Sequence, residues 1–514
     1  MARNKRSNRK CEFLLMDLEL ISVLAKNELG IPYPTEELDQ LWKLVLINQF
    51  HDILPGTSIH EVYEVTKKEY AIVKEKARAL LEERLAALAS SGNGITIFNT
   101  LGFEREDIVS LGDCKASFLK DQEGRLYPIQ QVADGSIAYI KGIPSKGATT
   151  FELIDTVEKD LEASLREIPF TLEGNKLETP FYNINLDDNG LFTSIYDKEN
   201  DREVLKAGEQ ANLLRMYEDK PIYYDNWDID MYYTEKYWDA KDLDRMEWTE
   251  LGPLRATLEI DRKISNTLIK QKIYFYSNSR RIDFETYVDW KEHQHLLKVH
   301  FPVNIHSDEA TFDVQFGNLT RKVHTNTSWD MARFESCGQK WIDMSEGRYG
   351  VSLLNDCKYG HSVKDSNMAI TLIKSGIEPN PMTDYEEHYF TYSLYPHNGN
   401  WRDGGTVKEA YKLNQPAYAV NGGALGANNS LISVNKDNVI IETIKEAEDG
   451  SGIIIRLYEC ENSLTKARVN LGIKASSIKE CNLIEEEAES IPINEEGFNI
   501  EIKPYEIKTY KICL

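Results

Sequence analysis

One short run near the N-terminus places an imidazole next to a carboxylate, just before a break in the backbone. The run is Asn48-Gln49-Phe50-His51-Asp52-Ile53-Leu54-Pro55-Gly56. Such a pair can bind a metal ion or hold a sugar hydroxyl. A histidine close to the end of a helix is also explained as a cap, because protonated imidazole is stabilised by the negative helix end. The spacing alone leaves both readings open.

Two further groups of residues could carry chemistry. The run 225–231 alternates Asp225, Asp228 and Asp230 with apolar residues. This alternation fits either a segment that lines a sugar cleft or a plain solvated face. The triplet His306-Ser307-Asp308 has metal-ligand residue types, but it follows a strand-like run and we interpret it as a coincidence of a strand or turn. His60 and His397 are expected to be a first-turn helix residue and a strand-end residue.

The elements that must position His51 are predicted to be helical. Residues from about 9 to 91 show helical spacing of apolar residues in three segments. Gly30-Ile31-Pro32 ends the first segment. The second begins at Thr35, its predicted N-cap, and ends at Pro55-Gly56. The third runs from Ile59 to about Ala89, and an antiparallel bundle would pack all three. The apolar face of the second segment is expected to be buried, so His51 would lie in the last turn of a buried helix. That face consists of Leu38, Leu41, Trp42, Val45, Leu46 and Phe50.

The pattern changes from helical to alternating after the predicted linker Ser90-Ser91-Gly92-Asn93-Gly94. Short alternating runs separated by Gly, Asp and Asn predict β-strands, and longer ones follow from Phe181 onwards. Asp187-Asp188-Asn189-Gly190 and Ser277-Asn278-Ser279 are turn signals between neighbouring strands. The sequence therefore predicts antiparallel, sandwich-forming sheets.

Composition excludes several classes of partner. The 514 residues carry a formal charge of −24, which argues against nucleic acid and anionic membranes. No apolar run approaches the roughly 18–20 residues of a membrane span. The basic run within residues 3–10 is expected to be the solvated start of a helix. Seven scattered cysteines and a polar start predict reduced thiols in a cytoplasmic protein.

The run around His51 resembles the middle-domain signature of glycoside hydrolase family 38, the zinc-dependent α-mannosidases. The β region is similar to the same family at several further runs in the same order. These are Phe181-Tyr182, Gly190 to Lys198, Asp225 to Tyr233, Asn326 to Asp330, Ser345 to Val351, Leu354 to Gly360 and Thr391 to His397.

The resemblance implies a retaining hydrolase of terminal α-D-mannosyl residues that uses two carboxylates. It also implies a Zn²⁺ ion that grips two mannose hydroxyls and favours a distorted ring. Of the family's zinc ligands, only the middle-domain histidine has a counterpart here, His51. The resemblance places Asp52 against the bound sugar, and Asp225 and Asp228 in its acidic-aromatic strip. The sequence supplies no catalytic carboxylate. The N-terminal β/α domain of the family would precede residue 1 and join in cis or in trans.

The expected fold class is α+β multidomain: a three-helix bundle followed by antiparallel β-sandwich domains, the large one similar to galactose mutarotase. The expected domains are 1–91 (bundle), 92–172 (small β domain), 173–430 (large sandwich) and 431–514 (C-terminal β domain).

Three functions remain in competition. The first is the middle and C-terminal part of an α-mannosidase acting on mannose-containing oligosaccharides, with little activity expected of the chain alone. The second is a non-catalytic carbohydrate-binding β-sandwich protein, and the third is a scaffold that forms a homo-oligomer.

Overall fold

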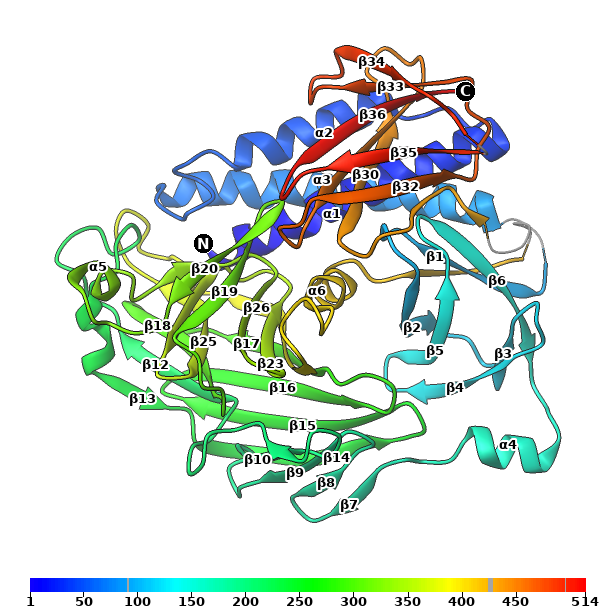
Figure 1. The fold of residues 1–514 in the computed structure, drawn as a ribbon. Coiled ribbons are helices and arrows are strands. Elements are labelled where there is room, and N and C mark those ends of the chain that lie inside the picture. Colours follow the sequence, from blue (N-terminus) through cyan, green and yellow to red (C-terminus); the bar gives the residue numbers. More distant parts are fainter. Residues whose placement is uncertain (90–91, 424–428, 495) are drawn as a thin grey trace. The chain divides into compact units, whose positions relative to one another are not determined.

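The computed structural model describes residues 1–89, 92–423, 429–494 and 496–514. The chain forms two compact units. Figure 1 shows the helices and strands of the fold. Unit 1 comprises residues 1–10, 46–70 and 167–414, and unit 2 comprises residues 11–45, 71–166 and 415–514. The predicted linker lies partly outside the described residues, at 90–91. The predicted domain boundaries stay predictions.

The three predicted N-terminal helices are present as α1 (Ala2–Leu29), α2 (Thr35–Asn48) and α3 (His60–Ala89). Short helices occur later in the chain. They are α4 (Lys159–Leu165), the 3-10 helix η1 (Met231–Glu235), α5 (Ser328–Met331) and α6 (Thr406–Asn414).

The end of the second helix was predicted wrongly. Helix α2 ends at Asn48, and His51 lies in the turn that follows it. The hydroxyls of Thr57 and Ser58 donate to Asp52, at 3.1 Å to its Oδ1 and 2.6 Å to its carbonyl, and this folds the segment back before Pro55 is reached. Leu38, Leu41 and Val45 are buried as predicted, but Leu46 and Phe50 are exposed.

The described residues of unit 2 form three antiparallel sheets. The first has the order β2-β5-β4-β3-β6-β1-β27, and β28 also pairs with β6. Its strands are β1 (Gly94–Asn99), β2 (Arg105–Gly112), β3 (Phe118–Lys120), β4 (Leu126–Val132), β5 (Gly135–Ile143), β6 (Gly147–Ile154), β27 (Tyr418–Asn421) and β28 (Asn429–Ser430).

The other two sheets of unit 2 form a C-terminal sandwich, whose apolar core also contains Leu20 and Val23 of α1. One sheet consists of β29 (Ile432–Val434), β32 (Thr465–Leu471) and β35 (Gly497–Ile502). The other consists of β30 (Val439–Glu446), β31 (Ile453–Glu459), β36 (Ile507–Cys513), β33 (Ser477–Cys481) and β34 (Glu487–Ile491).

Unit 1 is built on a large sandwich of a six-stranded and a nine-stranded sheet, with a smaller five-stranded sheet beside them in the chain. The small sheet is β11 (Arg202–Glu203), β10 (Phe192–Asp197), β9 (Tyr182–Leu186), β8 (Lys176–Glu178) and β7 (Thr171–Glu173). The six-stranded sheet is β13 (Tyr237–Asp239), β12 (Leu213–Glu218), β18 (His295–Pro302), β25 (Asn367–Ser375), β24 (Gly360–Lys364) and β21 (Ser336–Cys337). The nine-stranded sheet is β14 (Asp242–Leu251), β15 (Arg255–Ile264), β16 (Thr267–Tyr276), β17 (Ile282–Asp289), β26 (Glu387–Asn398), β23 (Tyr349–Asn355), β22 (Trp341–Glu346), β19 (Glu309–Val314) and β20 (Gly317–Lys322).

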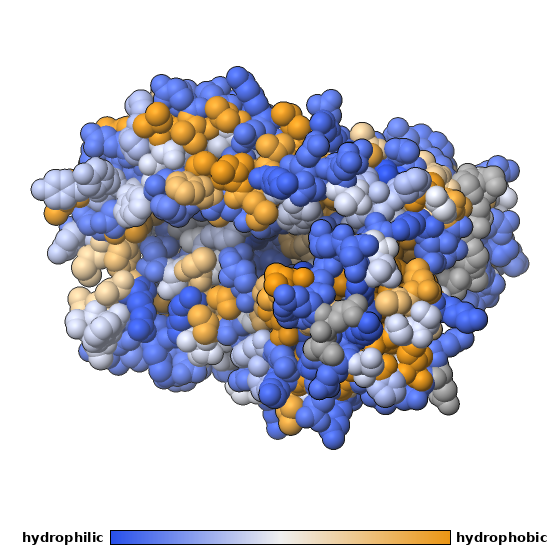
Figure 2. All heavy atoms as spheres, turned by 90° about the horizontal axis from the view of Figure 1, so that it is seen from above, coloured by the Kyte–Doolittle hydropathy of each residue, from blue (hydrophilic) through white to orange (hydrophobic). Residues whose placement is uncertain are grey.

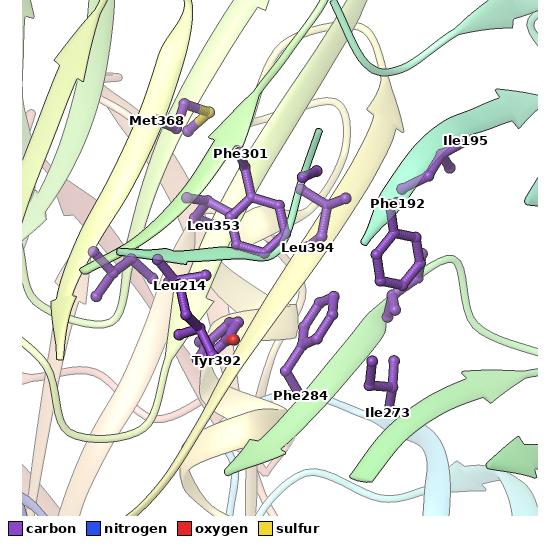
Figure 3. Packing of buried hydrophobic residues seen from close by; sticks show 14 of the residues in the cluster. Phe192, Ile195, Leu214, Ile273, Phe284, Phe301, Leu353, Met368, Tyr392 and Leu394 are labelled. Carbon is purple, nitrogen blue, oxygen red and sulfur yellow. The ribbon is translucent and has the colours of Figure 1, made fainter. Parts of the chain in front are cut away.

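The core of the large sandwich is aromatic at its centre. Phe284 stacks on Tyr392 with ring centroids 5.0 Å apart, and Phe301 packs edge-on against both rings (Figure 3). The Tyr392 hydroxyl stays paired although it is buried, because Gln271 donates to it at 2.7 Å and it donates to Asn212 at 2.6 Å. Both predicted turns connect neighbouring strands, and the predicted fold class of a helix bundle with antiparallel sandwiches is confirmed.

The basic run at the start of α1 was predicted to be solvated, and this prediction is wrong. Arg9 is only 2% exposed. Its guanidinium donates to the carbonyls of Asn355, Gln339 and Lys358 at 3.1–3.2 Å, and also to Asn355 Oδ1 at 2.8 Å. The side chain further lies 4.3 Å over the ring of Tyr359. A planar guanidinium has several donors in a fixed geometry, so one arginine side chain can donate to several backbone carbonyls of the same bend.

Glu19 is a buried carboxyl between α1 and α2. The indole Nε1–H of Trp42 donates to Glu19 Oε1 at 3.0 Å. Burial raises the pKa of Glu19 from 4.5 to about 7, and the Trp42 hydrogen bond offsets only part of that effect. None of the described helices combines the length and the apolar composition that crossing a bilayer requires.

We expect Arg9→Ala to lower the free energy of unfolding of unit 1 by about 3–5 kcal/mol, because three buried carbonyls lose a charged donor. Differential scanning calorimetry would measure the change. Lys43→Ala is the control, because Lys43 only forms an exposed pair with Asp39 at 2.7 Å and its loss should cost about 0.5 kcal/mol or less. Equal melting temperatures of Arg9→Ala and the wild type would contradict this stabilising role of Arg9.

Stability should fall as the pH rises from 5 to 8. The folded state keeps the proton of Glu19 up to about pH 7, whereas the unfolded state loses it near 4.5, so this stabilisation is complete below 4.5 and is lost as the pH rises through 7. Glu19→Gln keeps a neutral partner for Trp42 and should flatten this part of the curve. Melting temperatures across the pH range test this, and identical slopes for both proteins would refute it.

Candidate functional site

The segment 49–59, here called the histidine turn, presents the predicted metal ligand to solvent. The side chain of His51 is 75% exposed, and its Nε2 lies 3.5 Å from Asp52 Oδ2. The ring also packs against Phe50, with centroids 4.2 Å apart. Asp52 is held in place by Thr57 and Ser58, so the turn is rigid around an accessible imidazole nitrogen.

The segment 222–232, here called the aromatic strip, carries the predicted carboxylates and a row of uncovered rings. Tyr224 adopts a left-handed backbone conformation with φ of 52°, which is uncommon for a bulky residue and is found most often at functional loops. The backbone amides of Trp227 and Asp228 both donate to the Tyr224 carbonyl, at 2.7 and 3.0 Å. Trp227 and Asp228 are exposed as a result.

Asp225 is not the solvent-facing carboxylate that the alternation indicated. It is 5% exposed, and it accepts hydrogen bonds from the backbone amides of Ile377 and Glu378 at 2.9–3.0 Å and from Gln294 at 3.1 Å. A Cβ at position 376 would lie 2.6 Å from Asp225 Oδ1, so glycine is required there. Asp225 therefore clamps the strip to the segment 376–384, here called the clamp loop.

The clamp loop also contacts the residues next to the histidine turn. His60 Nδ1 lies 3.3 Å from Asn380 Oδ1 at the start of α3. From the other side, Asn226 Nδ2 donates to Thr383 Oγ1 at 2.8 Å. The start of α3, the clamp loop and the strip are thus linked by side-chain contacts within unit 1. Sequence reasoning missed Asn226, Asn380 and Thr383, whose only signal was their polar type beside Gly376.

Large apolar side chains are exposed on all three segments and on the helix end beside them. Monomeric proteins rarely expose large contiguous apolar patches, and those that are exposed mostly mark interaction sites. Clusters of hydrophobic residues are also visible on the face of the molecule drawn in Figure 2. The exposed apolar residues of the three segments are Leu46, Ile47, Phe50, Ile59, Ile222, Tyr223, Tyr224, Trp227, Met231, Tyr232, Ile377 and Met382.

The donor set is too small for a complete metal site. Among the described residues, no group of three or more His, Cys, Asp or Glu side chains is arranged to hold a metal ion. His51 offers one accessible nitrogen and Asp52 one carboxylate, whereas zinc takes four ligands. The described residues therefore do not form a complete zinc site by themselves.

The remaining predicted residues lie elsewhere. Asp308 pairs with Lys322 at 2.9 Å, consistent with a coincidental His-x-Asp triplet. His397 is buried in β26, where its Nε2 lies 2.8 Å from Asp343 Oδ2. Glycines tightly surround this ring, since a Cβ at Gly350 or Gly404 would lie 2.3–2.4 Å from its atoms, which indicates a structural role.

Three family models match the chain. Residues 1–88 match the alpha mannosidase middle domain, residues 177–382 the glycosyl hydrolases family 38 C-terminal domain, and residues 438–510 the glycosyl hydrolases family 38 C-terminal beta sandwich domain.

Similar proteins support the same grouping. Human alpha-mannosidase 2C1 is 31% identical over all of this chain, which covers 49% of that protein. An alpha-mannosidase of Saccharomyces cerevisiae is 28% identical over 99% of this chain and 47% of its own length. The chain thus spans about half the length of the curated relatives it matches. An alpha-mannosidase structure from Enterococcus faecalis V583 superposes with a TM-score of 0.82 at 16% identity, covering 99% of this chain and 67% of that one, which shows the shared fold.

Asp225→Asn should loosen the aromatic strip, because the charge-assisted bonds from the Ile377 and Glu378 amides are lost and the new amide Nδ2 faces the Gln294 donor that Oδ2 now accepts. We expect hydrogen exchange of residues 222–232 to become at least about tenfold faster, which corresponds to about 1.4 kcal/mol. Asp228→Asn is the matched control, since Asp228 is exposed and its carboxylate accepts a hydrogen bond from the backbone amide of the next residue, at 2.9 Å. Similar exchange rates in both variants would contradict the clamp.

Proposed function

The chain carries the middle and C-terminal domains of glycoside hydrolase family 38, and on that basis we propose that it forms the substrate-facing half of a retaining α-mannosidase. The reaction is hydrolysis of terminal α-D-mannosyl residues of mannose-containing oligosaccharides. The relatives matched over its whole length are alpha-mannosidases, and this supports the substrate class.

The observation that carries the proposal is the exposed His51-Asp52 pair, together with a strip of uncovered aromatic rings in the same unit. His51 lies three residues beyond the end of α2 and its side chain is 75% exposed, so it neither belongs to the last turn of that helix nor fills a core. Aromatic faces next to a carboxylate suit a sugar, because the ring stacks on its C–H face while the carboxylate accepts from hydroxyls.

In this proposal His51 Nε2 is one ligand of a zinc ion, and Asp52 and Asp228 accept hydrogen bonds from sugar hydroxyls. Zinc would supply Lewis-acid polarisation of the substrate oxygens that it binds. Asp225 has a positioning role, because its carboxylate is buried under the strip. The attacking and protonating carboxylates of a retaining glycosidase belong, in this proposal, to the part of the relatives that this chain does not span.

The remaining ligands and the catalytic carboxylates would come from a β/α domain joined in cis or in trans. The exposed apolar residues of the histidine turn suit such a partner, since an isolated surface of this kind is costly in water. We also propose a cytoplasmic location, supported by seven cysteines that are all free. A homo-oligomer is compatible with the same surface.

The test reconstitutes the chain with the polypeptide encoded directly upstream of it and measures hydrolysis of an aryl α-mannoside with zinc. We expect activity from the pair, and a loss of at least about 100-fold in His51→Ala, since a missing ligand weakens metal binding. Zinc content per complex should fall with it. His306→Ala is the control, because it removes an exposed histidine of the unrelated His-x-Asp triplet.

Two outcomes would overturn this proposal. An inactive pair in which both parts are folded would contradict the mannosidase assignment. Mannose-oligosaccharide binding that persists in His51→Ala without zinc, in the absence of hydrolysis, would favour the non-catalytic carbohydrate-binding alternative. Full zinc content in His51→Ala would refute the ligand role alone.

A further inference from the structure

Tyr224 in the aromatic strip combines a strained backbone with an uncovered ring. Its φ is 52°, and the residue is 68% exposed. A left-handed conformation is unfavourable for any L-residue with a side chain, because the Cβ comes too close to the following carbonyl oxygen. Glycine adopts the same conformation without that cost. Tyrosine at this position is therefore less favourable for folding than glycine would be.

The backbone conformation at position 224 is explained by the two residues that follow it. Asp225 and Asn226 are both buried, at 5% and 2% exposure. In an extended segment consecutive side chains point to opposite faces, so the chain must turn for both to reach inward. The Tyr224 carbonyl closes this turn by accepting the amides of Trp227 and Asp228 at 2.7 and 3.0 Å. The turn requires the conformation, but it does not require a tyrosine side chain.

Tyr224 differs in burial from the other aromatic residues that have a positive φ. Among the described residues these are Phe316, with φ of 57°, and Tyr505, with φ of 54°. Both are half-buried, so packing offsets part of their backbone strain. The exposed ring of Tyr224 gains much less from packing. Strained residues collect at ligand sites, and a strained, uncovered ring on an anchored loop indicates a binding role.

The rings of the strip suit a ligand longer than one sugar unit. The ring centroids of Tyr223 and Tyr224 lie 6.4 Å apart, and the ring planes differ by 42°. Trp227 adds a third ring that is 65% exposed. The face of one pyranose cannot lie flat on two planes that diverge by this angle, so the rings suit successive units of a chain. In the proposed function, the mannosyl unit that is removed is bound at His51 and Asp52.

We propose that Tyr224 is a specificity-determining residue, whose ring stacks on the sugar unit adjoining the mannosyl unit that is removed. This inference rests on the proposed function and adds a substrate preference to it. The enzyme would favour oligosaccharides over α-mannosides whose leaving group is not a sugar. Because Asp225 and Asn226 anchor the backbone next to the ring, stacking there loses little conformational entropy.

The test compares two substrates of the reconstituted pair, linear α-mannotriose and α-mannosyl fluoride, whose leaving group carries no sugar. We expect Tyr224→Gly to lower kcat/KM for mannotriose about five- to tenfold, mainly through KM, because the stacking contact is lost. The same variant should change kcat/KM for the fluoride by less than about twofold, because no contact of the removed unit is altered. Tyr224→Phe keeps the ring and should retain at least about half of the wild-type value on mannotriose.

Melting temperatures separate this role from a structural one. Tyr224→Gly removes the left-handed strain, so it should melt no lower than the wild type, while a tyrosine needed for folding would give a lower value. Tyr505→Gly is the matched control, because it makes the same change at a half-buried left-handed tyrosine in unit 2. It should leave the ratio of kcat/KM for the two substrates unchanged.

Equal losses on both substrates, or a Tyr224→Phe variant as impaired as Tyr224→Gly, would overturn the role of Tyr224. A folded wild-type pair that hydrolyses neither substrate would instead contradict the proposed function. In that case isothermal titration of the full chain with mannotriose decides on Tyr224 by itself. Binding that is about five- to tenfold weaker in Tyr224→Gly supports the sugar contact. Equal binding of both proteins, or no binding at millimolar concentration, refutes it.

Discussion

The guanidinium of Arg9 is the interaction on which the geometry of unit 1 depends. It satisfies the carbonyls of Asn355, Gln339 and Lys358 where β23 ends and the chain bends. The neighbouring Lys10 pairs with Asp356 at 3.0 Å, and the Thr391 amide of β26 donates to the same carboxylate at 3.0 Å. Burial opposes ionisation of Asp356, but Lys10 and the hydrogen-bond donors around it outweigh that effect and bring its pKa down to about 2. The start of α1 is therefore docked at two central strands, β23 and β26, of the nine-stranded sheet.

This docking fixes the histidine turn as well. Lys5 donates to the carbonyl of Leu54 at 3.0 Å, and Gln49 donates to Asn8 at 3.0 Å. Arg3 pairs with Glu386 at 2.7 Å just before β26 begins. The entry to β26 is therefore held by the same helix start that holds the histidine turn.

Periodicity predicted the elements well and their ends poorly. The three helices, the antiparallel sheets and the turn at Asp187 to Gly190 follow from local signals that packing reinforces, since Asp187 Oδ1 accepts the amides of Asn189 and Leu191 at 2.9 Å. The end of α2 does not follow from such local signals, because it depends on hydrogen bonds that Thr57 and Ser58, which lie after Pro55-Gly56, donate to Asp52. The five basic residues between positions 3 and 10 were predicted to be solvated. Arg9 is buried because it donates to carbonyls 330–349 positions further along the chain, and the sequence does not show that these come close. Residue types and spacing singled out His51 but placed it in a buried helix, whereas its side chain is 75% exposed. The burial of Asp225 depends on the approach of Gly376 from a distant loop, which the sequence does not show.

The aromatic strip is a loop with a left-handed Tyr224, and two neighbouring residues attach it to the clamp loop. Asp225 accepts the backbone amides of Ile377 and Glu378. Asn226 donates through its side chain to Thr383 Oγ1 and through its backbone amide to the Glu378 carbonyl. The exposed rings on either side of these two buried residues are therefore carried by a short anchored segment, and the conformation of the strip depends on that of the clamp loop.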